Sequence, residues 1–138
     1  MTRIFATLVL AALVSAACRG TSTPPTPLNE IVKTRSGNLE VVLLSAETAV
    51  KTGKDAVTIE FRAVSDGRLI DVGMVKANAT MLMAGMAPMF GPVDVERSAV
   101  PGRYLASTEL SMAGEWRLSL EWNGPEGQGA VTFSPLVH

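Results

Sequence analysis

Histidine and cysteine, on which many catalytic and metal sites depend, are nearly absent from this chain of 138 residues. It contains one cysteine, Cys18, and one histidine, His138. A hydrolytic triad needs a histidine beside a nucleophile, and zinc or blue-copper sites need several imidazole or thiolate ligands. The sequence therefore excludes triad hydrolases.

An excess of charge of one sign is also missing. Twelve basic and 13 acidic residues give a net charge of −1, so there is no basic field to attract nucleic acid or anionic lipid. Two carboxylates, Asp94 and Glu96, are close in sequence, but their two-residue spacing on a strand indicates a solvated face rather than an acid and base pair.

Long hydrophobic runs are absent except near the N-terminus. Arg3 precedes an apolar run, Ile4–Val14, that is followed by Ser15-Ala-Ala-Cys18. Eleven residues span roughly 16 Å as a helix, about half of a bilayer core, so a membrane-spanning anchor is disfavoured. We expect residues 1–17 to be a lipoprotein signal peptide and Cys18 to be the lipid attachment site; cleavage before a free thiol is the alternative. Either predicts a location in a bacterial cell envelope, outside the cytoplasm.

The segment after Cys18 is rich in proline, threonine and serine and has no apolar periodicity. Such a composition favours an extended, solvated chain. We expect residues 18–36 to be a flexible linker and residues 37–138 to form one domain. With no cysteine after Cys18, that domain must fold without disulfides.

From Leu39 onward the apolar residues recur with a period of two, which is typical of half-buried strands. The clearest examples are residues 57–63 and 116–122. The fold class predicted is all-β: an immunoglobulin-like antiparallel β-sandwich of about seven strands. The weaker predicted strands are Leu39–Ser45, Arg68–Val72, Val75–Met83, Val93–Glu96, Arg103–Leu110 and Gly129–Phe133.

Sulfur is the soft ligand type that the chain has in quantity. Of seven methionines, Met81, Met83, Met86 and Met89 fall within nine residues, and Met112 follows. Thioethers are soft ligands, and in a cell envelope they suit Cu(I) or Ag(I). The sequence thus makes Cu(I) the candidate cofactor.

Strand alternation distinguishes among these methionines. In a strand over 75–83, Met81 and Met83 point toward the core, whereas Met86 and Met89 lie in a loop bounded by glycine and proline. If the following strands alternate in direction, the turn that carries Met112 lies at the same end. The candidate metal ligands are therefore Met86, Met89 and Met112, with Met83 as a fourth. Two alternatives stay open: an apolar surface that grips a partner protein, and plain packing.

Four motifs resemble those of a known family. They are Gly37-Asn-Leu-Glu-Val-Val, the run Met81–Met89, Pro101-Gly-Arg-Tyr104 and Leu110-Ser-Met-Ala-Gly-Glu-Trp116-Arg-Leu. In order and spacing they resemble a YtkA-like domain, which is related to FixH-type proteins, over roughly residues 36–123. Tyr104 and Trp116 are expected to fill the core.

The resemblance implies a small immunoglobulin-like sandwich outside the cytoplasm and no enzymatic activity. It also implies partners among metal-efflux or oxidase-assembly proteins. Members of the family often mix histidine with methionine near the first methionine motif, whereas this chain has only Met86-Ala-Pro-Met89, which favours monovalent over divalent copper. The membrane helix of FixH-type members is replaced here by the expected lipid anchor.

Two functions follow as hypotheses. The first is a lipid-anchored envelope domain that binds or passes on Cu(I) or Ag(I) through its methionines. The alternative is a protein-interaction or structural module that contacts an envelope or respiratory membrane complex.

Overall fold

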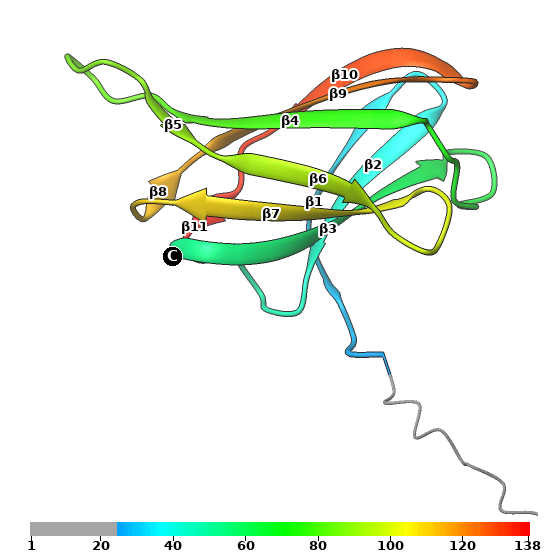
Figure 1. Cartoon of the computed structure of the whole chain (residues 1–138), viewed down its shortest axis with the longest axis horizontal. Helices are drawn as coiled ribbons and strands as arrows, with labels where there is room; N and C mark the ends of the chain where they lie inside the picture. The colour runs from blue at the N-terminus through cyan, green and yellow to red at the C-terminus, as the bar shows by residue number, and fades with distance from the viewer. Residues whose placement is uncertain (1–24) are drawn as a thin grey trace, which may run out of the picture.

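The computed structural model describes residues 25–138, and they form an antiparallel β-sandwich (Figure 1). The predicted signal peptide, residues 1–17, and the predicted lipid attachment at Cys18 lie outside the described residues. The strands are β1 (Asn29–Ser36), β2 (Leu39–Ser45), β3 (Gly53–Ala63), β4 (Met74–Met81), β5 (Met89–Gly91), β6 (Val93–Arg97), β7 (Arg103–Leu110), β8 (Gly114–Glu115), β9 (Arg117–Gly124), β10 (Gly127–Phe133) and β11 (Leu136–Val137).

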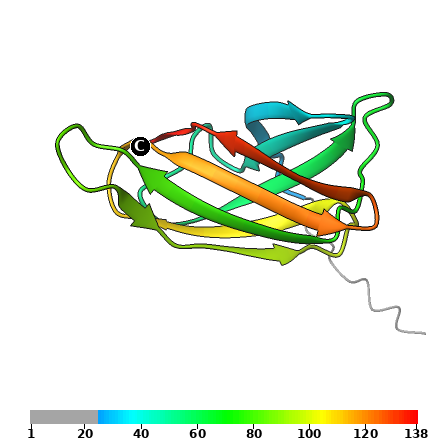
Figure 2. The same ribbon diagram turned by 90° about the horizontal axis from the view of Figure 1, so that it is seen from above.

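Two main sheets form the layers of the sandwich. One has five strands in the order β1-β2-β3-β7-β6, and the other has four in the order β10-β9-β4-β5. In Figure 2 the four-stranded sheet, in green, orange and red, lies in front of the five-stranded one. The short pair β11-β8 joins the C-terminal segment to the end of the sandwich. The all-β sandwich predicted from the period-two pattern is confirmed. Residues 25–138 contain no helix that could cross a membrane.

Several strand boundaries differ from the sequence prediction. The predicted flexible linker, residues 18–36, was too long, because Asn29–Ser36 form β1 and pair with β2. The predicted strand Arg68–Val72 was wrong, since Leu69 forms only an isolated bridge to Arg62. The chain turns there because the Gly73 amide donates a hydrogen bond to the Asp71 carboxylate, with N···Oδ1 at 2.9 Å.

The core lies between the sheets and is built from the alternating residues of β3, β7 and β9. Phe61 packs edge-on against Tyr104 and Trp122, with ring centroids 5.4 and 5.1 Å apart. Gly129 pairs with Trp122 across β10 and β9, and a Cβ atom at position 129 would overlap the indole ring. The small residue is therefore needed there so that the large one can close the core.

The Tyr104 hydroxyl is the main polar group inside the sandwich. Its single proton is shared between the Gly73 carbonyl at 2.9 Å and the Asp71 carboxylate at 3.1 Å. Burial raises the pKa of Tyr104, and the neighbouring Asp71 raises it further. The hydrogen bonds from the Gly73 amide and the Tyr104 hydroxyl, together with the charge of Arg97, outweigh burial and lower the pKa of Asp71. This end of the fold is thus held by a structural hydrogen-bond network.

Removing that hydroxyl tests the network. We expect Tyr104→Phe to lower the free energy of unfolding by about 1–2 kcal/mol, because a buried carbonyl loses its donor while the ring stays in place. Urea unfolding followed by circular dichroism measures the effect. Ser107→Ala, an exposed position on the same strand, is the matched control and should change stability by less than about 0.5 kcal/mol. Equal stability of the two variants would contradict the assignment.

Candidate functional site

The chain path brings the two methionine-bearing segments to the same end of the sandwich. β4 is antiparallel to β5, the chain changes sheets at Gly91-Pro92, and β6 then runs antiparallel to β7. β7 therefore ends at Leu110 on the side where β4 ends at Met81. This is the arrangement predicted from alternating strand directions. In Figure 1, β8, which comes directly after β7 in the chain, lies at the same end of the sandwich as β5.

Close packing at Gly91 holds β5 against the rest of this end. A Cβ atom at Gly91 would lie 2.5 Å from Leu110 Cδ2 and 3.1 Å from Trp116 Cζ3. Because Gly91 has no side chain, β5 rests directly on the buried side chains of Leu110 and Trp116. The position of Met89, two residues earlier in β5, follows from that contact.

Met89 meets the turn after β7. The Ser111 hydroxyl donates a hydrogen bond to Met89 Sδ over 3.0 Å. Met89 is half-buried and lies in edge strand β5, not in the loop in which the sequence analysis placed it. The strand was missed because three residues bounded by proline on either side show no measurable alternation.

Met112 is the next residue of the same turn. Its carbonyl accepts a hydrogen bond from the buried Trp116 indole, with Nε1···O at 3.0 Å. The backbone at Met112 is thereby tied to the core, while 40% of the residue remains exposed. Met89 therefore lies beside the turn that carries Met112 at this end of the sandwich. The two contacting residues, Met89 and Ser111, are 22 positions apart in the sequence.

Met81 lies on the inner side of the same place. It pairs with Met89 across β4 and β5 and is only 6% exposed. A Cβ atom at Gly114 would lie 2.6 Å from Met81 Cε, so the end of this side chain covers the glycine of β8. The core orientation predicted for Met81 is confirmed.

Met83 and Met86 occupy the connection that projects beyond the strands (Figure 1, Figure 2). Met83 lies beyond the end of β4 and is half-buried against the core. The Met86 amide donates to the Met83 carbonyl over 3.2 Å in a turn, and Met86 is 65% exposed. Of the four candidate ligands, the contacts of the described residues join Met89 to the turn of Met112 and leave Met86 at the tip.

Within residues 25–138 there is no group of three or more histidine, cysteine, aspartate or glutamate side chains placed to hold a metal ion. The candidate ligands that the sequence offers at this end are thioethers, and the Ser111 hydroxyl lies beside that of Met89. Such a donor set suits a soft monovalent ion and not a hydrated divalent one.

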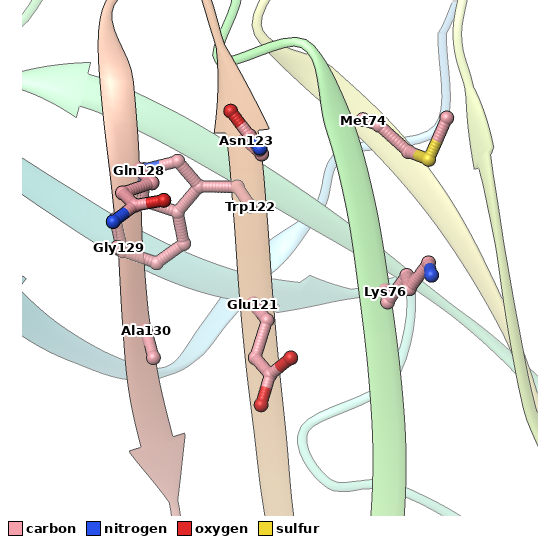
Figure 3. Close-up of a pocket in the computed structure, with 8 residues that line it drawn as sticks. All are labelled: Met74, Lys76, Glu121, Trp122, Asn123, Gln128, Gly129 and Ala130. Atoms are coloured by element: carbon pink, nitrogen blue, oxygen red, sulfur yellow. The ribbon is translucent and has the colours of Figure 1, made fainter.

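A hollow of the described surface lies elsewhere, on the outer face of the four-stranded sheet. Figure 3 shows that it is lined by side chains of β4, β9 and β10, and its volume is about 590 Å³. Sequence analysis did not single it out, since its polar residues follow the ordinary outward alternation of these strands. Every buried side-chain nitrogen and oxygen of the described residues has a hydrogen-bond partner, so no unpaired polar group marks this hollow as a ligand site. Its lining is Met74, Lys76, Glu121, Trp122, Asn123, Gln128, Gly129 and Ala130.

Comparison with known proteins gives one family. The YtkA-like family model matches residues 33–121, which is more than half of the chain. Among solved structures, a chain described as the ZirS C-terminal domain is 10% identical and aligns over 100% of this chain and 87% of its own length, with a TM-score of 0.47. No curated protein matches the chain significantly.

The matched region extends from within β1 to β9 and includes the methionine run, Tyr104 and Trp116. It covers most of the range over which the sequence motifs resembled this family. The chain therefore belongs to the YtkA-like family.

Proposed function

We propose that this protein is a non-enzymatic domain that binds and passes on a soft monovalent metal ion, Cu(I) or Ag(I), through thioethers at one end of its sandwich. The observation that carries the proposal is the contact of Met89 Sδ with Ser111 Oγ at 3.0 Å, which places one thioether beside the turn of a second, Met112. Met83 and Met86, on the adjoining connection, are the further candidate ligands.

The chemistry of the site supports transfer rather than storage. Thioethers are neutral and bind monovalent copper without releasing a proton. Met112 is 40% and Met86 65% exposed, so an ion at the rim is open to a partner. We further propose that the domain works in a bacterial cell envelope, tethered through Cys18 to a membrane. The partners proposed for it are metal-efflux or oxidase-assembly proteins.

Competition for Cu(I) tests the site. Purified protein is titrated without oxygen against a chromophoric Cu(I) chelator, beside the double variant Met89→Leu/Met112→Leu. We expect the affinity of the variant to fall by more than roughly tenfold, since even the loss of a group that only orients a metal ligand costs about that much. Leucine keeps the apolar volume, so the fold is retained.

Met74→Leu is the matched control. Met74 is 66% exposed and belongs to the outer face of the four-stranded sheet, away from this end. Its affinity should equal that of the unaltered protein. Equal affinities for all three proteins would contradict the proposed metal site, as would a failure of the unaltered protein to compete with the chelator. The single variants Met83→Leu and Met86→Leu then show whether either residue adds a ligand.

A second function is favoured by the apolar side chains around the tip. Leu82 is 58%, Met86 65% and Phe90 75% exposed, and all three lie on or beside the projecting connection. Exposed apolar clusters of this kind are typical of protein contact sites. In this alternative the domain grips a protein of an envelope or respiratory membrane complex.

Site-specific cross-linking separates the alternative from metal binding. A photoreactive residue at position 90 is expected to trap one defined partner in cells, in the presence of a copper chelator. The same residue in a Leu82→Ser/Met86→Ser background should trap none. Trapping that depends on copper and survives the serine substitutions would contradict the protein-contact function.

A further inference from the structure

We infer that Met81, a residue of the buried core, is the inner ligand of the soft-metal site, which then consists of the three thioethers Met81, Met89 and Met112. The inference rests on the proposed function and extends it to a ligand set and an ion selectivity. It also changes the ligand set expected from sequence, in which Met81 was a packing residue.

The strand register places Met81 beside Met89. The two residues are direct partners in the antiparallel pair of β4 and β5. Side chains of such partners lie on the same face of the sheet, with Cβ atoms about 4.5–5.5 Å apart. The two thioethers thus start from neighbouring positions and point to the same side, toward the turn after β7.

That turn is contacted by both side chains, on either side of Met112. Met89 Sδ meets Ser111, the residue before it, at 3.0 Å. The terminal methyl of Met81 lies over Gly114, two residues after it: a Cβ atom there would be 2.6 Å from Cε and 3.9 Å from Sδ. Because Gly114 has no side chain, the Met81 thioether can reach the backbone of this turn.

Burial of Met81 does not disqualify it as a ligand. A thioether is only a weak hydrogen-bond acceptor and loses little by leaving water, so a sulfur atom held dry at 6% exposure is available to an ion without breaking a polar interaction. Met112, at 40% exposure, supplies the wet side of the same set. A metal ion therefore enters past the exposed Met112, and the buried Met81 completes its coordination from the core side.

A ligand set of three thioethers, with Met81 as the buried one, favours monovalent soft ions over divalent ions. A divalent ion such as Cu(II) or Zn(II) has to exchange its water for nitrogen, oxygen or thiolate ligands. The three sulfur atoms and the Ser111 hydroxyl offer none of the anionic or imidazole ligands that such an ion needs. Cu(I) and Ag(I), which prefer soft ligands in low coordination numbers, match the set.

The methionine methyl groups report directly on the ligand set in the unaltered protein. With ¹³C-labelled methionine ε-methyls and Ag(I), a substitute for Cu(I) that is stable in air, we expect the NMR signals of Met81, Met89 and Met112 to shift together and saturate at one equivalent. The Met74 signal should stay in place. A stationary Met81 signal while Met89 and Met112 shift would overturn the inference and leave the proposed function standing. No shift at any of the three would overturn both.

The variant Met81→Leu provides the second measurement. We expect it to fold, because leucine has a similar volume, and to bind Cu(I) more than roughly tenfold more weakly than Met74→Leu does. Urea unfolding confirms that the variant is folded before affinities are compared. Undiminished Cu(I) affinity in folded Met81→Leu would show that this residue only fills the core.

Discussion

Replacing Trp116 with alanine is expected to lower the free energy of unfolding by about 3–5 kcal/mol, the usual cost of deleting a buried large aromatic side chain. Trp116 is fully buried and supports Gly91 of β5 on one side, while its indole nitrogen bonds to the Met112 carbonyl. The substitution therefore removes packing and a hydrogen bond together. Guanidinium unfolding measures the change.

Two further variants show how much of that loss comes from the indole hydrogen bond and whether any aromatic residue of this end would give it. Trp116→Phe keeps an aromatic ring but not the indole donor, so it should lose part of the stability and release the turn of Met112. Phe90→Ala is the matched aromatic control, because Phe90 lies one residue before Gly91 in the same strand and is 75% exposed; its effect should stay within about 0.5 kcal/mol. Similar losses for Trp116→Ala and Phe90→Ala would show that Trp116 is not the support of this end.

The second large effect is expected at Glu60, a carboxylate on the outer face of the five-stranded sheet. It is only 4% exposed, between the core-facing Ile59 and Phe61. Its two oxygens accept hydrogen bonds from Arg103 Nε and Arg62 Nε, each at 2.8 Å. The pair of guanidinium groups compensates for the removal of this charge from water.

The charges around Glu60 make the stability of the fold depend on pH. Burial by itself would raise the pKa of Glu60, but the hydrogen bonds and charges of Arg62 and Arg103 outweigh it and hold the pKa below its ordinary value of 4.5. A carboxylate with a lowered folded-state pKa stabilises the fold above its unfolded-state pKa, and this stability is lost as the pH falls through the folded-state value. The contribution is therefore complete at neutral pH and disappears in acid.

The variant Glu60→Gln should be less stable than the unaltered protein by about 1.5–3 kcal/mol near pH 7, the range for hydrogen bonds to charged groups. The difference should shrink as the pH falls below the ordinary carboxyl value of 4.5 and through the lowered pKa of folded Glu60, because the protonated carboxyl of the unaltered protein then resembles the amide. Urea unfolding across this pH range measures it. Glu121→Gln, exposed on the other sheet, is the control and should show neither effect. A penalty independent of pH would mean that Glu60 acts through packing and not through its charge.

Strand alternation explains which parts of the fold were predictable. β7 has the predicted bounds, β3 contains the first of the two clearest runs, and β9 contains the second apart from Trp116, because a strand between a core and solvent imposes a period of two on its own residues. β2 also has the predicted bounds, although its residues 41–45 are all buried. β1 was missed since it is an edge strand whose mostly exposed sequence, Asn29–Ser36, shows no apolar alternation. β5, β8 and β11 have two or three residues each, too few for any period to register.

The candidate methionine site was likewise predictable from the sequence only in part. Sequence reasoning identified sulfur as the available ligand, oriented Met81 to the core and placed Met112 at the same end as Met89. It did not foresee the pairing of Met81 with Met89, nor the contact of Met89 with Ser111. Both depend on register between strands, and register is decided by contacts between residues far apart in the chain.

By itself, the amino-acid sequence determined the class of this protein and the chemistry open to it: alternating apolar residues demanded a sandwich, and the scarcity of histidine and cysteine left thioethers as the soft ligands. Only the tertiary structure decided which thioethers meet. The physical reason is the sheet change at Gly91-Pro92 and the absence of a side chain at Gly91 and Gly114, which let β5, the Met112 turn and the end of β4 pack together. Alternation is a property of neighbours along the chain, whereas this proximity arises between segments that only folding brings into contact.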